Sequence, residues 1–334
     1  MTERLRASII IPTHNRCDVL SKVLSSYKTQ TISNDNFEHI IVDDGSSDDT
    51  QFIFNNLQPF KINKENIAVK QYENRIEGIR SGELEIKPEE NGGPIQIKYI
   101  KLKKSGRSVA RNIGIGLASY PLIIFADDDI FVEPMFIEKH IKEHDFDDMF
   151  VIRGTVIHTR SLEHPFSARW KPKDINTSFL ATGNASVLKK HLMSAGLFDE
   201  HYQIYGWEDF DLGIHLKQNG LSSIKKKIYG YHYDPHIRQL KPDLVYKKEK
   251  ERGFTAVYFY TSHPLGWVKR FTRVKNGLLD AVFRCLGRKN WFLKRDHISA
   301  LRGIVRLIIR YKGYFDGVRD GKMQYMHEDN VENR

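Results

Sequence analysis

Acidic side chains follow short apolar runs at two places in this sequence. Asp44 comes after one such run, and Asp127, Asp128 and Asp129 come directly after another. Adjacent carboxylates repel one another unless a cation neutralises them, and ligands that are all oxygen favour Mg²⁺ or Mn²⁺. Such an ion usually completes its shell with phosphate oxygens, so the pattern predicts a diphosphate substrate. The alternative is that these carboxylates cap helices or line a solvated turn.

A third acidic group lies far downstream. Glu208 and Asp209 follow Trp207, and Leu212 and Leu216 continue from them at helical spacing. The two carboxylates could simply favour the positive end of a helix dipole. They could equally supply a general base beside a sugar ring, with Trp207 packed on the apolar face of the sugar.

The elements that must position these groups alternate between strand and helix. Apolar runs predict strands at 7–12, 39–42 and 122–126, and further strands are expected at 95–102 and 222–229. Helices are expected at 18–28, 52–57 and 110–118. Such alternation indicates an α/β fold with a mostly parallel, twisted sheet flanked by helices. Ligands bind beyond the carboxyl ends of such strands, where the acidic clusters are expected. The polar stretch at about 63–94 is predicted to be an irregular insertion.

Composition places the chain among soluble globular proteins. It is 40% hydrophobic and 28% charged over 334 residues, and contains only two cysteines. No apolar run approaches the roughly 18 residues of a membrane-spanning helix, and the run at 7–11 is too short for a signal peptide. Cys17 and Cys285 suggest neither a disulfide framework nor a metal site. We therefore expect a cytoplasmic protein.

Six sequence blocks in a fixed order resemble those of family 2 glycosyltransferases, whose fold is GT-A. They are SIIIPTHNR (8–16), IIVDDGSSDDT (40–50), GRSVARNIGIGLA (106–118), FADDDIFVEP (125–134), TGNASVLKK (182–190) and GLFDE with GWEDFDLGIHL (196–216). The resemblance covers roughly residues 5 to 235. It implies an inverting, metal-dependent transfer from a nucleotide-sugar donor.

The resemblance also implies roles around the nucleotide. Pro12 and Thr13 would shape the nucleotide pocket, and Asp44 would bind the base, which is uracil in the commonest case. Arg111 would lie near the nucleotide or its phosphates; a structural ion pair to the acidic strand ends is the alternative.

The acidic triplet matches the DXD-type motif of the family. Asp127 is expected to face ribose and Asp129 to hold the Mn²⁺ or Mg²⁺ ion. Three consecutive aspartates leave the register open, so Asp127 is also a candidate metal ligand and Asp128 a candidate nucleotide-sugar contact. His232 or His236 could supply a metal-binding imidazole, with His232 favoured; a hydrogen-bonded structural histidine is the alternative.

Asp209 matches the catalytic base of the family's ED motif, with Glu208 beside it. In an inverting transfer one carboxylate removes the proton of the acceptor hydroxyl as its oxygen attacks the anomeric carbon. The metal stabilises charge on the leaving diphosphate.

The chain is expected to divide into a catalytic domain at 1–240 and a basic helical extension at 241–334. Residues 241–322 hold 20 Lys and Arg against 7 Asp and Glu, a net charge of +13. Apolar side chains recur at helical spacing at Ile298, Leu301, Val305 and Ile308, and aromatic side chains are interleaved with basic ones. This mixture suits the surface of an anionic membrane. The alternative is that the apolar stripe packs on the catalytic domain.

The expected function is therefore transfer of a sugar, most often from a UDP-sugar, to a glycan or lipid-linked acceptor in cell-envelope polysaccharide synthesis, at the inner face of the membrane. A metal-dependent nucleotidyltransferase and a noncatalytic glycosyltransferase-like subunit are the alternatives. Nucleic acid is not an expected partner, because the acidic clusters would repel it.

Overall fold

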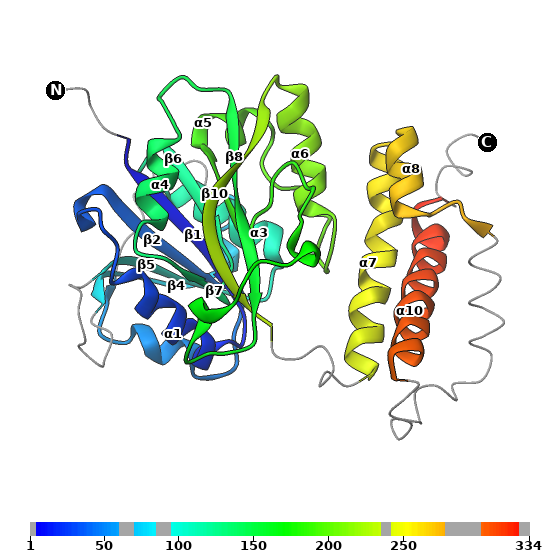
Figure 1. The fold of residues 1–334 in the computed structure, drawn as a ribbon, viewed down its shortest axis with the longest axis horizontal. Coiled ribbons are helices and arrows are strands. Elements are labelled where there is room, and N and C mark those ends of the chain that lie inside the picture. Colours follow the sequence, from blue (N-terminus) through cyan, green and yellow to red (C-terminus); the bar gives the residue numbers. More distant parts are fainter. Residues whose placement is uncertain (1–4, 60–69, 85–94, 235–241, 278–301, 327–334) are drawn as a thin grey trace. The chain divides into compact units, whose positions relative to one another are not determined.

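The computed structural model describes residues 5–59, 70–84, 95–234, 242–277 and 302–326. The chain forms two compact units. The sheet unit contains Met1–Gln203 and Glu208–Pro235, and the helical unit contains Ile204–Trp207 and His236–Arg334 (Figure 1). The helical unit thus takes in a short segment from the middle of the chain as well as the C-terminal part.

Ten strands and five α-helices are described in the sheet unit. The strands are β1 (Ala7–Thr13), β2 (Phe37–Asp43), β3 (Gln58–Pro59), β4 (Ile76–Leu84), β5 (Ile95–Leu102), β6 (Leu122–Ala126), β7 (Ile130–Val132), β8 (Phe150–Thr159), β9 (Asn184–Leu188) and β10 (Ser222–Tyr233). The helices are α1 (Cys17–Tyr27), α3 (Arg107–Leu117), α4 (Phe136–Lys142), α5 (Lys189–Ser194) and α6 (Glu208–Gln218).

All these strands belong to one mixed sheet, in the order β3-β4-β5-β2-β1-β6-β9-β8-β10-β7. The central four strands, β5, β2, β1 and β6, are parallel. Antiparallel pairing begins at β4 on one side and at β9 on the other. The predicted α/β fold with a parallel core is confirmed, and antiparallel strands extend it at both edges.

Helices cover both faces of this sheet and bury two apolar layers. One layer contains Leu20 and Val23 of α1 with Ile137 of α4, and the other contains Ile113 of α3 with Leu212 of α6. Both faces of β1 and β6 are therefore buried, which explains their nearly continuous apolar sequences, whereas β5 alternates apolar and polar side chains.

Two sequence predictions were wrong in this unit. The helix expected at 52–57 is a 3₁₀ helix at Asp49–Phe54, whose start is capped by the side chain of Asp48. The stretch at 63–94 is not irregular throughout, because 76–84 forms β4, antiparallel to β5. Most side chains of β4 are partly or fully exposed, so its sequence lacks the apolar run that reveals the buried strands.

The helical unit contains α7 (Pro242–Ser262), α8 (Gly266–Thr272) and α10 (Arg302–Tyr325). Helices α7 and α10 lie side by side (Figure 1). Glycines let their backbones approach: a methyl group at Gly253 would collide with the carbonyl of Tyr314, and one at Gly317 with the carbonyl of Lys250. The first three positions of the predicted apolar stripe, at 298, 301 and 305, have no described side chains.

None of the helices described in the structure is both long and apolar enough to cross a membrane.

Candidate active site

Parallel pairing brings the ends of three strands to one edge of the sheet. Thr13 at the end of β1 pairs with Asp43 at the end of β2, and β6 runs parallel to β1 and ends at Ala126. Asp44 donates its backbone N–H to the carbonyl of Thr13 (2.9 Å). The acidic residues after β2 and after β6 therefore lie at the same edge, as the sequence predicts for parallel strands. Pro12, one residue earlier on β1, is partly buried.

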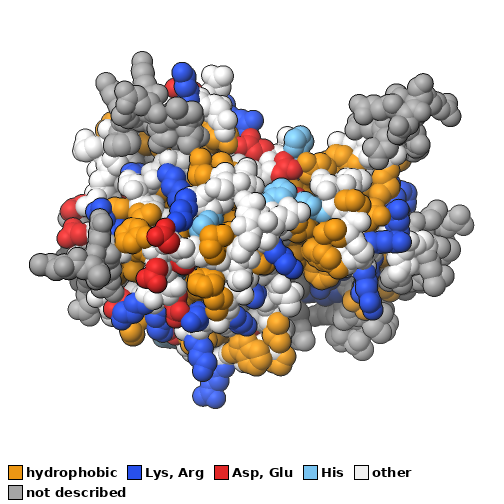
Figure 2. Space-filling view, turned by 90° about the horizontal axis from the view of Figure 1, so that it is seen from above, with side chains coloured by type: hydrophobic (Ala, Val, Ile, Leu, Met, Phe, Trp, Pro, Cys, Tyr) orange, Lys and Arg blue, Asp and Glu red, His pale blue; other side chains and the backbone are white. Residues whose placement is uncertain are grey.

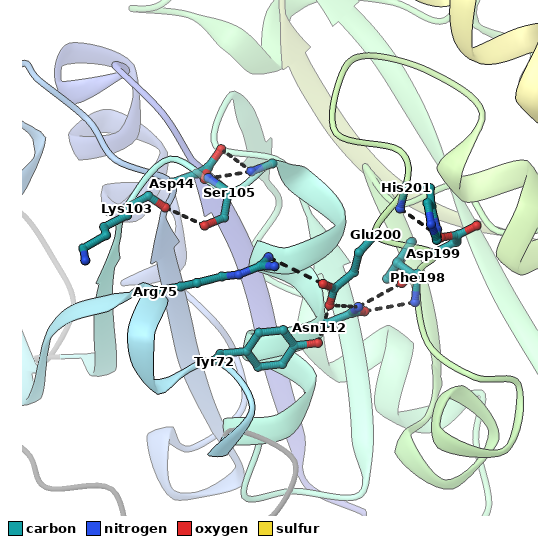
Figure 3. A network of polar contacts seen from close by, with 11 residues as sticks. Asp44, Tyr72, Arg75, Lys103, Ser105, Asn112, Phe198, Asp199, Glu200 and His201 are labelled. Carbon is teal, nitrogen blue, oxygen red and sulfur yellow. Dashed lines mark hydrogen bonds and ion pairs between the residues drawn. The ribbon is translucent and has the colours of Figure 1, made fainter. Parts of the chain in front are cut away.

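The buried carboxylate of Asp44 is held by the loop between β5 and α3. It accepts hydrogen bonds from the backbone N–H groups of Ser105 (2.6 Å) and Gly106 (3.0 Å) (Figure 3). In addition, Nζ of Lys104 lies 2.8 Å from Oδ2 of Asp44. Gly106 has φ +97°, a conformation that L side chains rarely adopt. The N–H of Gly106 also lies 3.1 Å from Oδ2, so both carboxylate oxygens of Asp44 are held by donors of this loop.

A second polar network lies beside this loop, and sequence analysis did not anticipate it. Glu200 accepts hydrogen bonds from the hydroxyl of Tyr72 and from Nδ2 of Asn112, and it forms an ion pair with Arg75 at 3.5 Å (Figure 3). The carbonyl of Arg75 accepts a hydrogen bond from the backbone N–H of Lys103. Part of the polar stretch at 63–94 is thereby fixed to the loop that holds Asp44.

Asp128 points back to β1. Its Oδ2 accepts a hydrogen bond from Oγ1 of Thr13 at 2.7 Å. Burial of the carboxyl group, and after it the negative charge of Asp129, raise the pKa of Asp128 to about 7. The like charges of the triplet thus disfavour its full ionisation in the absence of a cation.

Asp129 is buried and lies next to His232 of β10. Nε2 of His232 lies 3.3 Å from Oδ1 of Asp129, and the guanidinium of Arg16 lies 3.6 Å from Oδ2. Burial opposes ionisation of Asp129, but the imidazole and then Arg16 outweigh it and lower its pKa. Oδ1 of Asp129 has no hydrogen-bond partner among the described residues. His236 lies outside the described residues.

Arg111 links the acidic triplet to the downstream acid pair. Its Nη1 lies 3.1 Å from Oε1 of Glu208, and its Nη2 lies 3.4 Å from Oδ1 of Asp127. The side chains of Arg111 and Glu208 are buried, whereas that of Asp127 is partly exposed. The ion-pair alternative for Arg111 is therefore present in the structure, and the residue remains at the centre of the site.

Asp209 follows Glu208 in the first turn of α6. Its Oδ2 lies 3.3 Å from Oγ of Ser178, and its Oδ1 accepts a hydrogen bond from the backbone N–H of Phe210. Burial and then the charge of Glu208 raise the pKa of Asp209 to about 7, and Arg111 opposes them. A carboxylate with this pKa is well matched to remove a proton near neutral pH.

Trp207, directly before the acid pair, packs within the helical unit. Its indole ring is only 9% exposed and stacks on Phe259 of α7 at 5.4 Å between ring centroids. Its Nε1 donates a hydrogen bond to the carbonyl of Arg252 (2.8 Å). One face of the ring is thus stacked and its N–H is bonded within the helical unit, and the contact of Trp207 with a sugar stays a prediction.

Two further side chains near the candidate metal site were missed. The rings of His158 on β8 and His232 are 5.1 Å apart, and Nδ1 of His158 lies 2.8 Å from Oδ1 of Asp174. These contacts depend on the pairing of β8 with β10, where His158 is opposite His232. No motif in the sequence signals such a pairing.

The profile described as glycosyl transferase family 2 matches residues 8–81 and 85–195, which is more than half of the chain. The protein is a family 2 glycosyltransferase. The glycosyltransferase therefore has the enzyme class and the GT-A fold that its sequence predicts. The matched residues include Asp44 and the triplet, and end before the acid pair of α6.

Several curated proteins resemble this glycosyltransferase in sequence. It is 27% identical over 282 residues to a hyaluronan synthase of Pasteurella multocida, covering 71% of this chain and 25% of the relative. It is 25% identical over 317 residues to an uncharacterized glycosyltransferase, YfnE, of Bacillus subtilis. That match covers 76% of this chain and 72% of the relative. The chain thus spans only about a quarter of the length of the synthase.

Among solved structures, a mannosyltransferase of Pyrobaculum calidifontis in complex with GDP-Man and Mn²⁺ has a similar fold. The TM-score is 0.55 at 14% identity, and the match covers 97% of this chain and 88% of that one. At this identity the similarity concerns the fold of the glycosyltransferase alone.

Proposed function

We propose that this glycosyltransferase is an inverting, metal-dependent enzyme that transfers a sugar from a nucleotide-sugar donor to a hydroxyl group of a glycan or lipid-linked acceptor. One observation carries the proposal: Arg111 contacts both Asp127 and Glu208. Two acidic groups that are about 80 residues apart in the sequence therefore belong to one site.

Asp129 and His232 are the residues that would hold a divalent ion. Their facing atoms, Oδ1 and Nε2, are 3.3 Å apart. Oδ1 of Asp129 is buried and, apart from this contact with His232, makes no hydrogen bond among the described residues, so a ligated cation would satisfy it. Carboxylate and imidazole ligands suit Mn²⁺, and Mg²⁺ is the alternative. When bound, the ion would act as a Lewis acid that neutralises charge on the leaving diphosphate.

Nearby residues leave room for the donor at this edge. A methyl group at Gly183 would lie 3.2 Å from Oδ2 of Asp127, so glycine keeps the space beside that carboxylate open. We assign Asp127 to the ribose and Asp44, with Pro12 and Thr13, to the nucleotide. UDP is the nucleotide expected from the family resemblance.

Asp209 is the proposed general base. It would accept the proton of the acceptor hydroxyl while that oxygen attacks the anomeric carbon from the side opposite the leaving nucleoside diphosphate. Burial, and after it the charge of Glu208, which Arg111 holds in place, raise the pKa of Asp209. No covalent intermediate with the enzyme is needed.

The acceptor and the location are also proposals. Synthesis of a cell-envelope polysaccharide would bring the enzyme to the inner face of the membrane. We assign catalysis to residues 1–240 and membrane contact to the basic extension at 241–334, whose Lys and Arg would bind anionic lipid. Figure 2 shows Lys and Arg side chains in several separate groups, among apolar and acidic ones, on the face that it draws.

Donor turnover tests the function. The purified full chain is incubated with Mn²⁺ or Mg²⁺ and a panel of UDP-, GDP- and dTDP-sugars, and release of nucleoside diphosphate is followed. Metal-dependent release of UDP from one donor is the expected result. Release of pyrophosphate would indicate a nucleotidyltransferase. Absence of turnover with every donor and with oligosaccharide acceptors would indicate a noncatalytic subunit.

A further inference from the structure

The segment that leads to the acid pair is held by α7. Residues 204–207 belong to the helical unit, and the chain continues from them directly to Glu208. The carbonyl oxygen of Tyr205 lies 3.2 Å from Oγ1 of Thr255, which also lies 3.0 Å from the carbonyl oxygen of Glu251 within α7. The backbone just before the candidate base therefore contacts a helix that is far away in the sequence.

Gly206 allows a close approach to that helix. Its φ is +119°, and a methyl group there would lie 3.1 Å from Cγ of Arg252 and 3.3 Å from Oγ1 of Thr255. Any larger residue would be strained in its backbone and crowded by α7.

Trp207 completes the attachment in an unusual backbone conformation. Its φ is +73°, which for a bulky residue costs about 1–2 kcal/mol. The indole offsets this strain by stacking on Phe259 at an interplanar angle of 12°, by the hydrogen bond to Arg252, and by an edge contact with Phe271 at 5.5 Å. The conformation at the entry of α6 thus depends on side chains of α7 and α8.

We propose that Trp207, Thr255 and Phe259 are positioning residues for the transfer reaction. By fixing the backbone at the entry of α6, they set the direction of the carboxylates of Glu208 and Asp209. The proposal rests on the function proposed above for Asp209. Both acids lie in the first turn of α6, where the preceding backbone determines their direction, and a misplacement of about 1 Å can lower a rate about 100-fold.

The first test compares two threonines of α7 in the full chain. Thr255→Val removes the hydroxyl group that faces Tyr205, and Thr261→Val removes one that donates only to the carbonyl of Tyr258 within the helix (2.9 Å) among the described contacts. We expect Thr255→Val to lower kcat for the fastest UDP-sugar of the panel about tenfold, with KM changed less than about twofold. Thr261→Val should leave both unchanged.

The second test removes the stacked ring. Phe259→Leu should lower kcat about tenfold or more at unchanged KM, while Trp207→Phe, which keeps an aromatic ring for the stack, should retain more activity than Trp207→Leu. Activity is normalised to the folded fraction from a melting curve. A lower melting temperature with normal kcat per folded molecule would show a merely structural role and overturn the proposal.

Hydrogen exchange gives a readout that does not need turnover. Peptides that span residues 204–212 should exchange faster in Phe259→Leu than in the wild type, and no faster in Thr261→Val. Unchanged exchange in Phe259→Leu would overturn the proposal. Failure of the wild type to release UDP would instead refute the proposed function, and the exchange result would still decide whether α7 fixes the entry of α6.

Discussion

Nη1 of Arg111 lies 3.1 Å from Oε1 of Glu208, and both side chains are buried. The pair joins α3 to the start of α6, and the second guanidinium nitrogen extends it to Asp127. Buried charges are tolerated when they are paired, but the loss of one partner leaves the other charge buried and uncompensated. This relationship makes the stability of the sheet unit and the geometry of the site depend on the same side chain.

Replacing Arg111 should therefore destabilise the protein as well as inactivate it. Arg111→Met leaves Glu208 buried and uncompensated, which we expect to lower the free energy of unfolding by about 3–5 kcal/mol. Urea denaturation measures this change. In the double variant with Glu208→Gln much of the loss should be recovered, and simple additivity of the two single effects would contradict a direct pair.

The two aspartates should separate binding from turnover. Asp129→Asn removes a candidate metal ligand, so Mn²⁺-dependent binding of UDP should weaken, whereas Asp209→Asn should bind UDP normally and lose kcat by about 10²–10⁴-fold. Calorimetric titration with UDP and Mn²⁺ measures the first effect, and UDP release the second. Full activity in either variant would refute the assignment of that residue.

The pH dependence of kcat should report Asp209. Its pKa is raised to about 7 by burial and by Glu208, and a base acts only when deprotonated, so kcat should rise as the pH increases through about 7. Removing the neighbouring charge in Glu208→Gln should lower the pKa of Asp209 and move this rise to lower pH. A rise that stays in place, in a variant that remains folded, would argue that another group titrates.

Stability should fall in mild acid because of a buried histidine on β2. Burial lowers the pKa of His39 from 6.5 to about 4, so between these values the unfolded chain binds more protons than the folded one. The contribution of neutral His39 to the free energy of unfolding is fully present above pH 6.5. It is lost as the pH falls toward 4, by up to about 3 kcal/mol. Denaturation at pH 7 and pH 4.5 should show a smaller loss for His39→Phe. The exposed His164→Gln should behave as the wild type.

Membrane contact should depend on α8. Leu265 and Trp267 are 43% and 48% exposed, and Lys269 and Arg270 are exposed beside them. Leu265→Ser with Trp267→Ser should reduce sedimentation of the protein with vesicles that contain anionic phospholipid. The matched control is Ile175→Ser, which changes an apolar side chain of the sheet unit that is 57% exposed. Equal sedimentation of all three proteins would refute docking through α8.

Sequence analysis predicted the buried part of the sheet well. The strand expected at 95–102 has those bounds, and apolar side chains alternate with polar ones over much of its length, as buried positions alternate with more exposed ones. Strand β7 has three residues and the side chains of β4 are mostly exposed, so neither gives a periodic signal.

The candidate site was predictable only where its residues are neighbours in the sequence. The acidic groups stand out as clusters at strand ends and at a helix start. Ser178, Arg16 and His158 reach the site through loops and strand pairing that no local pattern encodes. The packing of Trp207 could not be foreseen for the same reason, since its partner Phe259 lies on a helix 52 positions away.

The chain passes from the sheet unit into the helical unit at residue 204 and back into the sheet unit at residue 208. A single cut near residue 240 would therefore not yield two intact pieces. Such a cut would remove α7 and with it Phe259, on which the indole of Trp207 stacks. The indole and the backbone of Trp207, which has a positive φ, would then lose that contact. Shortened versions of this enzyme should be expected to lose more than their C-terminal helices, and point substitutions on the intact chain are the sounder way to assign a task to each unit.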